Sequence, residues 1–67
     1  MELVINGERR TVPEGLTALN VLEYLSVPSE RVVVEVNLTI LKRAQLETTT
    51  LKDGDRVEIV QLIGGGV

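Results

Sequence analysis

The 67-residue sequence has no cysteine and no histidine, and its single aromatic residue is a tyrosine. Without cysteine, the chain forms no disulfide bonds and no thiolate metal sites. The commonest general bases and thiol nucleophiles are missing as well, and a chain this short rarely encloses a water-excluding pocket. We therefore expect a protein that is not an enzyme and holds no metal.

Positive charge is also scarce, which limits the possible partners. The net charge is −3 and the isoelectric point is about 4.8, values that disfavour a phosphate backbone as ligand. The near absence of aromatic residues removes the stacking surface that single-stranded nucleic acid uses. No segment approaches the ~20 apolar residues of a membrane span, and no signal peptide precedes the first predicted strand. We expect no nucleic acid or membrane partner and a cytoplasmic location.

The length predicts one domain, and a chain of this size buries only about 60% of the surface that its unfolded form exposes. With so few aromatic residues, the core has to consist of leucine, isoleucine and valine. We predict that the following residues form it, between a helix and a sheet: Leu3, Ile5, Leu22, Leu25, Val57 and Ile59.

The first half of the chain predicts a hairpin followed by a helix. Residues 2–5 and 8–12 flank Asn6-Gly7, a dipeptide that tolerates the two positive φ angles of a type I′ turn. A helix over residues 18–25 follows, with Thr17 as its N-cap and one apolar stripe at helical spacing: Ala18, Val21, Leu22 and Leu25. The helix should end near Ser26, because Pro28 disfavours helical geometry in the residue before it.

The second half of the chain predicts mainly strands. Residues 31–36 contain four β-branched valines, which occupy both alternating sets of positions, and this favours the central strand of a sheet. Asn37-Leu38 is expected to turn the chain into a short segment over residues 39–41. The pattern then weakens, with one helical turn expected near residues 44–46, and a last strand is predicted over residues 56–62.

The sequence Asp53-Gly54-Asp55 precedes this last strand. Two carboxylates so close in sequence could hold a metal ion. Aspartates that flank a glycine more commonly form a turn, because their side chains accept hydrogen bonds from nearby backbone. We therefore predict a turn at this position.

The order of elements indicates an α+β protein of the β-grasp (ubiquitin-like) fold. It predicts a mixed four- to five-stranded sheet with one main helix packed on one face. The first and last strands should lie side by side and parallel in the middle of this sheet. We assign residues 1–63 to the β-grasp domain and residues 64–67 to a flexible C-terminal glycine tail.

Three segments in the second half of the chain resemble the ThiS family, the sulfur carriers of the thiamin pathway. They are Val-Val-Val-Glu-Val-Asn at residues 32–37, Leu-Lys-Asp-Gly-Asp-Arg-Val-Glu-Ile-Val at residues 51–60, and Ile-Gly-Gly-Gly at residues 63–66. The resemblance implies that an E1-like adenylyltransferase (ThiF type) activates the carboxylate of Gly66 with ATP and Mg²⁺. Sulfur from cysteine, delivered through a cysteine desulfurase, then gives a thiocarboxylate, and a thiazole synthase (ThiG type) takes up that sulfur. The carrier itself catalyses no step and binds no cofactor.

The glycine tail suits this role, because residues without a Cβ let the backbone enter a narrow site. Residues 63–66 would reach about 13 Å when extended, at ~3.3 Å per residue. Gly64 and Gly65 would form this tail, with Gly66 as the activated residue. Val67 departs from the family pattern, in which glycine is last. We expect a peptidase to remove Val67; a chain that is not activated in the usual way and a cloning artefact are the alternatives.

The alternating pattern of the strands predicts a partner-binding surface on the sheet face away from the helix. Val4, Val33, Val60 and Leu62 should point to this face and form an exposed apolar patch bordered by Glu35 and Glu58. Patches of this kind on small proteins often mark interfaces. The alternative is that these are separate surface residues with good strand propensity.

Three other functions fit the same pattern. They are the small subunit of molybdopterin synthase, another ubiquitin-like sulfur carrier, and a regulatory β-grasp module of the RNA-associated kind. The acidic net charge and the terminal glycines disfavour the regulatory module.

Overall fold

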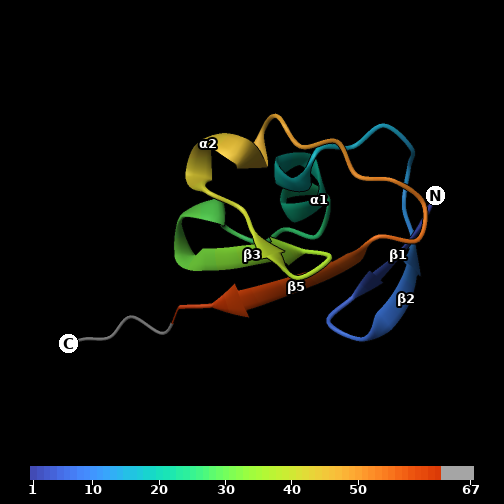
Figure 1. Ribbon diagram of the computed structural model, residues 1–67, viewed down its shortest axis with the longest axis horizontal. Helices are drawn as coiled ribbons and strands as arrows, with labels where there is room; N and C mark the ends of the chain where they lie inside the picture. The colour runs from blue at the N-terminus through green and yellow to red at the C-terminus, as the bar shows by residue number, and fades with distance from the viewer. Residues whose placement is uncertain (63–67) are drawn as a thin grey trace.

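The computed structural model describes residues 1–62, which form one mixed sheet with a helix packed on one of its faces (Figure 1). The elements follow in the order β1 (Glu2–Ile5), β2 (Glu8–Thr11), α1 (Ala18–Tyr24), the 3₁₀ turn η1 (Ser29–Arg31), β3 (Val32–Val36), β4 (Thr39–Ile40), α2 (Arg43–Leu46) and β5 (Arg56–Gln61).

The sheet has five strands in the order β2-β1-β5-β3-β4. As predicted, the first and last strands are parallel neighbours. The other strand pairs are antiparallel. The prediction of a central strand at residues 31–36 is wrong, because β5 holds that place and β3 lies between β5 and β4. The valines of β3 that suggested a central position are buried in alternation, with Val32 and Val34 buried and Val33 only half-buried, so their abundance reflects strand propensity.

The N-terminal hairpin turns at Asn6 and Gly7, whose φ angles are 49° and 83°. Both central residues therefore have the positive φ that a type I′ turn requires, and the predicted turn is confirmed. β2 ends at Thr11, one residue earlier than expected. Val12 still pairs with Met1, because its N–H donates to the Met1 carbonyl at 2.9 Å and its carbonyl accepts from the Met1 amino group at 2.7 Å, and its side chain is buried in the core.

Helix α1 begins directly after Thr17, the predicted N-cap. The Thr17 hydroxyl accepts a hydrogen bond from the Asn20 N–H at 3.1 Å, and the Asn20 side chain accepts one from the Thr17 N–H at 3.1 Å. These reciprocal bonds satisfy two donors that a helix start leaves without partners. The helix ends at Tyr24, one residue before the predicted end, and Ser26 has a φ of 60°.

The core lies between α1 and the inner face of the sheet. Its buried members are Leu3, Ile5, Val12, Ala18, Val21, Leu22, Val32, Val34, Leu46, Leu51 and Val57. Of the six predicted core residues, four are fully buried, whereas Leu25 and Ile59 are only partly buried at the border of the cluster. The cause is the short helix, which ends before it can cover this end of the sheet.

The second half of the chain contains the single helical turn that was predicted, α2. Arg43 at its start joins α2 to η1 by donating to the carbonyls of Ser29 at 2.7 Å and Glu30 at 2.8 Å. The turn before β4 has positive φ at both Asn37 (50°) and Leu38 (72°). Within residues 1–62, no helix is long and apolar enough to cross a membrane.

Candidate protein-binding site

Strand β5 leads from the middle of the sheet to the segment that carries the glycines. It ends at Gln61, and the N–H of Leu62 donates to the Arg31 carbonyl at 2.7 Å. The predicted tail residues Gly64, Gly65 and Gly66, together with Val67, lie outside the described residues. The structure therefore defines how the root of the tail is held.

Two asparagine side chains hold the first part of β5 on both of its edges. Asn6 accepts a hydrogen bond from the Ile59 N–H at 2.7 Å and donates to the Ile59 carbonyl at 3.3 Å. On the other edge, Asn37 accepts from the Arg56 N–H at 2.9 Å. Both asparagines stand at turn positions with positive φ, which asparagine tolerates better than most residues. Asn6 follows β1 and Asn37 follows β3. The side-chain amide of each asparagine thus adds a hydrogen bond to β5 at a point where the backbone of the neighbouring strand has already turned away.

The Asp-Gly-Asp turn fixes where β5 begins. Asp55 accepts hydrogen bonds from the Lys52 N–H at 2.8 Å and from the Asn37 side chain at 3.0 Å. Asp53 accepts from the Glu2 N–H at 2.6 Å, which ties the turn to the start of β1. The predicted turn is confirmed, and both carboxylates accept hydrogen bonds from backbone N–H groups. Within residues 1–62, no group of three or more histidine, cysteine, aspartate or glutamate residues could hold a metal ion.

The face of the sheet that points away from α1 brings together three of the four predicted patch residues. Val33 and Val60 are direct partners in the β3–β5 ladder, so their side chains share this outer face. Leu62 follows Val60 by two residues and emerges on the same side. Val60 and Leu62 are each 50% exposed, and Val33 is half-buried.

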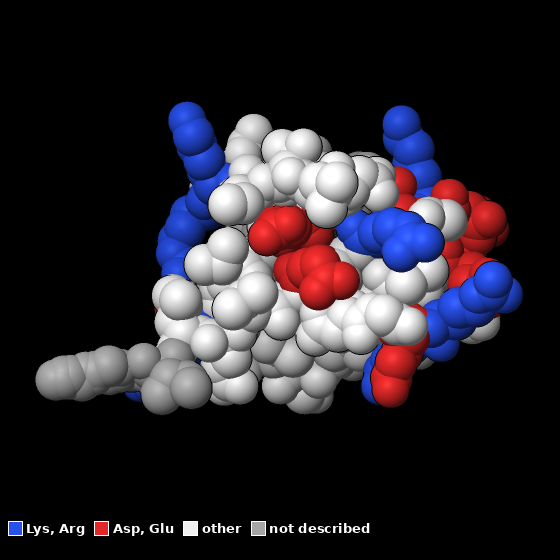
Figure 2. Space-filling view, turned by 60° about the horizontal axis from the view of Figure 1, so that its bottom comes forward, with Lys and Arg blue, Asp and Glu red and all other residues white. Residues whose placement is uncertain are grey.

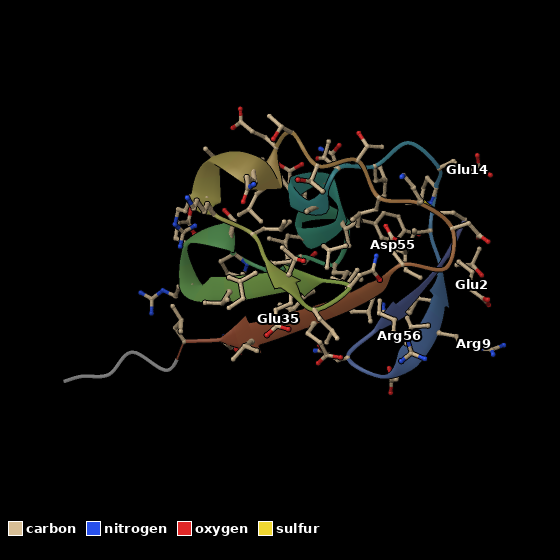
Figure 3. All side chains as sticks on the ribbon, in the orientation of Figure 1. Glu2, Arg9, Glu14, Glu35, Asp55 and Arg56 are labelled. Atoms are coloured by element: carbon tan, nitrogen blue, oxygen red, sulfur yellow. The ribbon has the colours of Figure 1, made fainter. Side chains whose placement is uncertain are left out.

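Val4 lies on the same outer face but away from the other three residues. It is level with Arg56 on β5 and with Arg9 on β2. Figure 3 shows both arginines at the hairpin end of the sheet. Val60 follows Arg56 by four positions along β5, a distance of about 13 Å at the rise of a strand. Val4 is therefore a half-buried residue between two basic positions, separate from the apolar group.

Two glutamates separate these regions of the outer face. Glu35 on β3 and Glu58 on β5 are direct partners across the ladder. Figure 2 shows acidic side chains near the centre of this face, with uncharged side chains beside them. Like charges directly opposite each other disfavour the pairing. The outer face thus has an apolar end near Leu62, an acidic middle, and a basic end around Val4.

Sequence reasoning missed Ile40, which is 62% exposed and pairs with Glu35 across the β3–β4 ladder. It therefore belongs to the outer face and enlarges the apolar end. The signal was the turn at Asn37-Leu38: a two-residue turn makes residues 36 and 39 partners, and hence residues 35 and 40. We call Val33, Ile40, Val60 and Leu62 the apolar end of the outer face.

This surface is suited to contact with another protein. It offers exposed aliphatic side chains beside the root of the tail, and nothing in residues 1–62 covers them. Patches of exposed apolar side chains rimmed by charge are typical of interaction sites.

The sheet order and the single packed helix place the chain in the class of β-grasp (ubiquitin-like) proteins. A solved structure agrees: the crystal structure of thiamine biosynthesis protein ThiS from Geobacter metallireducens superposes with a TM-score of 0.86 at 42% identity. The match covers 98% of this chain and 100% of that one. The family model described as ThiS family matches residues 3–66. The chain belongs to the ThiS family.

Two further relatives differ in length. A sulfur carrier protein ThiS from Thermus thermophilus is 39% identical over 62 residues, which cover 92% of this chain and 95% of that protein. A thiazole synthase from Paramagnetospirillum magneticum is 44% identical over 66 residues, which cover 98% of this chain and 20% of that protein. The chain therefore spans about a fifth of the length of this synthase.

Proposed function

We propose that this protein is a sulfur carrier of thiamin biosynthesis that catalyses no reaction itself. The observation that carries the proposal is the match to the ThiS family over residues 3–66, which includes the three glycines. The close structural agreement with a thiamine biosynthesis protein supports it. So does the absence of cysteine and histidine, which removes the usual catalytic side chains.

The proposed chemistry takes place at the carboxylate of Gly66. An E1-like adenylyltransferase uses ATP and Mg²⁺ to join a carboxylate oxygen to the α-phosphorus, and pyrophosphate leaves. The terminal sulfur of a persulfide, formed from cysteine by a desulfurase, then attacks the carbonyl carbon, and AMP leaves. A thiol reductant supplies the two electrons that cleave the S–S bond of the resulting acyl disulfide. The resulting thiocarboxylate donates its sulfur to thiazole synthase. In this scheme the chain binds no cofactor of its own and acts in the cytoplasm.

The apolar end of the outer face is the proposed docking surface for these partners. It includes Leu62, the last described residue before the glycines, so a partner that binds this surface can direct the tail into its own site. The relative from Paramagnetospirillum magneticum, in which the matching segment is a fifth of a thiazole synthase, supports the synthase as one such partner.

Val67 has to be removed before activation in this proposal. A β-branched side chain at the reacting carboxylate would crowd a site shaped for glycine. A chain ending at Gly66 should therefore form the thiocarboxylate, and the chain ending at Val67 should not. A peptidase would supply the mature end in the cell.

The test is the intact mass of both chains after incubation with the adenylyltransferase, ATP, Mg²⁺ and a sulfur source. The proposal expects a sulfur-for-oxygen increase in the chain ending at Gly66 only. Equal conversion of the two chains would show that Val67 does not block activation. If neither chain is converted, the proposed carrier role is wrong. Rescue of a carrier-deficient strain in thiamin-free medium, set against rescue of a molybdopterin-deficient strain, separates the two pathways.

A further inference from the structure

The inner face of the sheet has a groove at the end that α1 leaves uncovered. It has a volume of about 370 Å³. Its apolar lining includes Leu25, Val27 and Ile59, all of which are only partly buried. The groove lies on the opposite face of the sheet from the proposed docking surface. Gln61, the last residue of β5, also lines it.

Strand β5 extends past its neighbour β1 at this groove (Figure 1). The β1–β5 ladder pairs only Val4 with Arg56 and Ile5 with Val57. The side chain of Asn6 then forms hydrogen bonds with both the N–H and the carbonyl of Ile59. Beyond that point, β1 has already turned into the hairpin.

The direction of each backbone group in β5 follows from the bonds that are present. Residues 56 and 62 bond to the β3 side, through the Asn37 N–H to the Arg56 carbonyl and the Leu62 N–H to the Arg31 carbonyl. Residues 57 and 59 bond to the β1 side. Because backbone groups alternate along a strand, the N–H and C=O of Gln61 point to the β1 side. Within residues 1–62, no strand lies beside them there.

The rim of the groove carries one acid and one base, Glu8 and Arg10 on β2. Their partners in the β1–β2 ladder are Ile5 and Leu3, so both side chains lie on the inner face. Their charges cancel, which gives no preference for an anionic or a cationic ligand. An open pair of backbone groups beside a groove with a mixed apolar and polar lining is complementary to an extended polypeptide, which adds hydrogen bonds along the strand and a side chain for the apolar part of the groove.

We propose that an extended segment of thiazole synthase pairs with β5 at Gln61 and places an apolar side chain in this groove. The inference rests on the proposed function, which supplies the partner. It adds a second contact, on the inner face and edge of the sheet, to the docking surface on the outer face. The synthase would then hold the root of the tail from both sides of the sheet.

A proline at residue 61 tests the pairing selectively. Gln61→Pro removes the N–H that points to the open β1 side of the strand, while the β3–β5 bonds use the residues on either side of it. Gln61→Ala removes the same side chain and keeps the N–H, so it is the matched control. We expect Gln61→Pro to bind thiazole synthase about tenfold more weakly than Gln61→Ala, the effect of one lost interfacial hydrogen bond. Equal affinities of the two variants would overturn the inference.

Amide hydrogen exchange of the unmodified chain gives a second readout that does not depend on how the proline variant folds. In the free protein, the Gln61 amide should exchange faster than those of Val60 and Leu62. In the complex with thiazole synthase, its exchange should slow. A Gln61 amide that is already protected in the free chain, or that stays unprotected in the complex, would contradict the pairing. If the unmodified chain binds no synthase, the proposed function fails first and this inference fails with it.

Discussion

The two ends of β5 differ in how the rest of the sheet holds them. At the start, Val57 is 1% exposed, and both edges of the strand are bonded, to β1 with Asn6 and to β3 with Asn37. At the end, Val60 is 50% exposed, and within residues 1–62 Gln61 has a neighbouring strand on one edge only. One strand therefore supplies the centre of the core and, a few residues later, a surface for other proteins.

This difference separates stability from binding along a single strand. A substitution at the start should act on folding, because it breaks packing and two ladders. A substitution at the end should act on binding, because the side chains there are exposed to solvent and the backbone pairs with β3 alone among residues 1–62. Four changes test this division, from the largest expected effect to the smallest.

The largest effect is expected for Val57→Asp. Val57 is among the most deeply buried side chains of the protein, and a carboxylate there would have no partner in the apolar core. Burying an unpaired charge costs several kcal/mol, against a total stability of about 5–15 kcal/mol for ordinary domains. We expect circular dichroism to show an unfolded chain at 25 °C. A folded variant with a native spectrum would mean that the start of β5 can leave the core.

Asn6→Ala should reduce the free energy of unfolding by about 2 kcal/mol, because it removes two hydrogen bonds to Ile59 and places alanine at a positive φ. Urea unfolding measures the change. Asn6→Asp is the matched control, since it keeps the acceptor for the Ile59 N–H and loses only the donor. Its stability should fall between those of the other two proteins, and a value equal to that of Asn6→Ala would show that the acceptor contributes nothing.

Val60→Asp should change the free energy of unfolding by no more than about 0.5 kcal/mol, as for other exposed positions. It should weaken binding to the adenylyltransferase or the thiazole synthase by tenfold or more, on the order of 1.4 kcal/mol, because it puts a charge into the apolar end of the outer face. Calorimetry measures both affinities. Thr11→Asp, an exposed change on the far edge strand, is the control. Normal binding of both partners by Val60→Asp would contradict the docking surface.

The smallest effect is expected for Glu58→Gln, at the boundary between the two ends. Glu58 faces Glu35 directly, so removing one charge should raise stability by roughly 0.2–1 kcal/mol. The gain should shrink at 1 M salt, which screens exposed charges. Glu14→Gln, in the exposed loop after β2, should show no such gain. A loss of stability in Glu58→Gln would mean that this carboxylate has a favourable partner.

Local patterns predicted most of the elements, and the order of elements predicted that the first and last strands are neighbours in the middle of the sheet. The central place that was predicted for residues 31–36 was wrong. Asn6-Gly7 predicted its turn and Thr17 its cap, because both depend on neighbours in sequence. The central place of β5 depends on pairing between segments far apart, since the hydrogen bond from the Ile59 N–H to the Asn6 side chain spans 53 residues. Short-range alternation carries no information on such a choice, so the valines of β3 were misleading.

The candidate site was predicted only in part, because its residues also come from segments that are far apart in the sequence. Alternation along β5 placed Val60 and Leu62 on the outer face, and the ladder with β3 brings Val33 beside them. Alternation along β1 gave the correct face for Val4, but its distance from Val60 depends on the register between β1 and β5. Ile40 was missed because β4 has only two residues, too few to show a period.

The central position of β5 also has a mechanical consequence. A partner that draws on the chain beyond Leu62 pulls β5 along its own axis, between two flanking hairpins that pair with it and not with each other. In the antiparallel ladder the hydrogen bonds lie across this direction, so the load falls on many of them at once in shear. Peeling an edge strand such as β2 would break them one after another. The C-terminal segment that a partner pulls on thus follows the strand whose removal from the sheet requires the most hydrogen bonds to break at once.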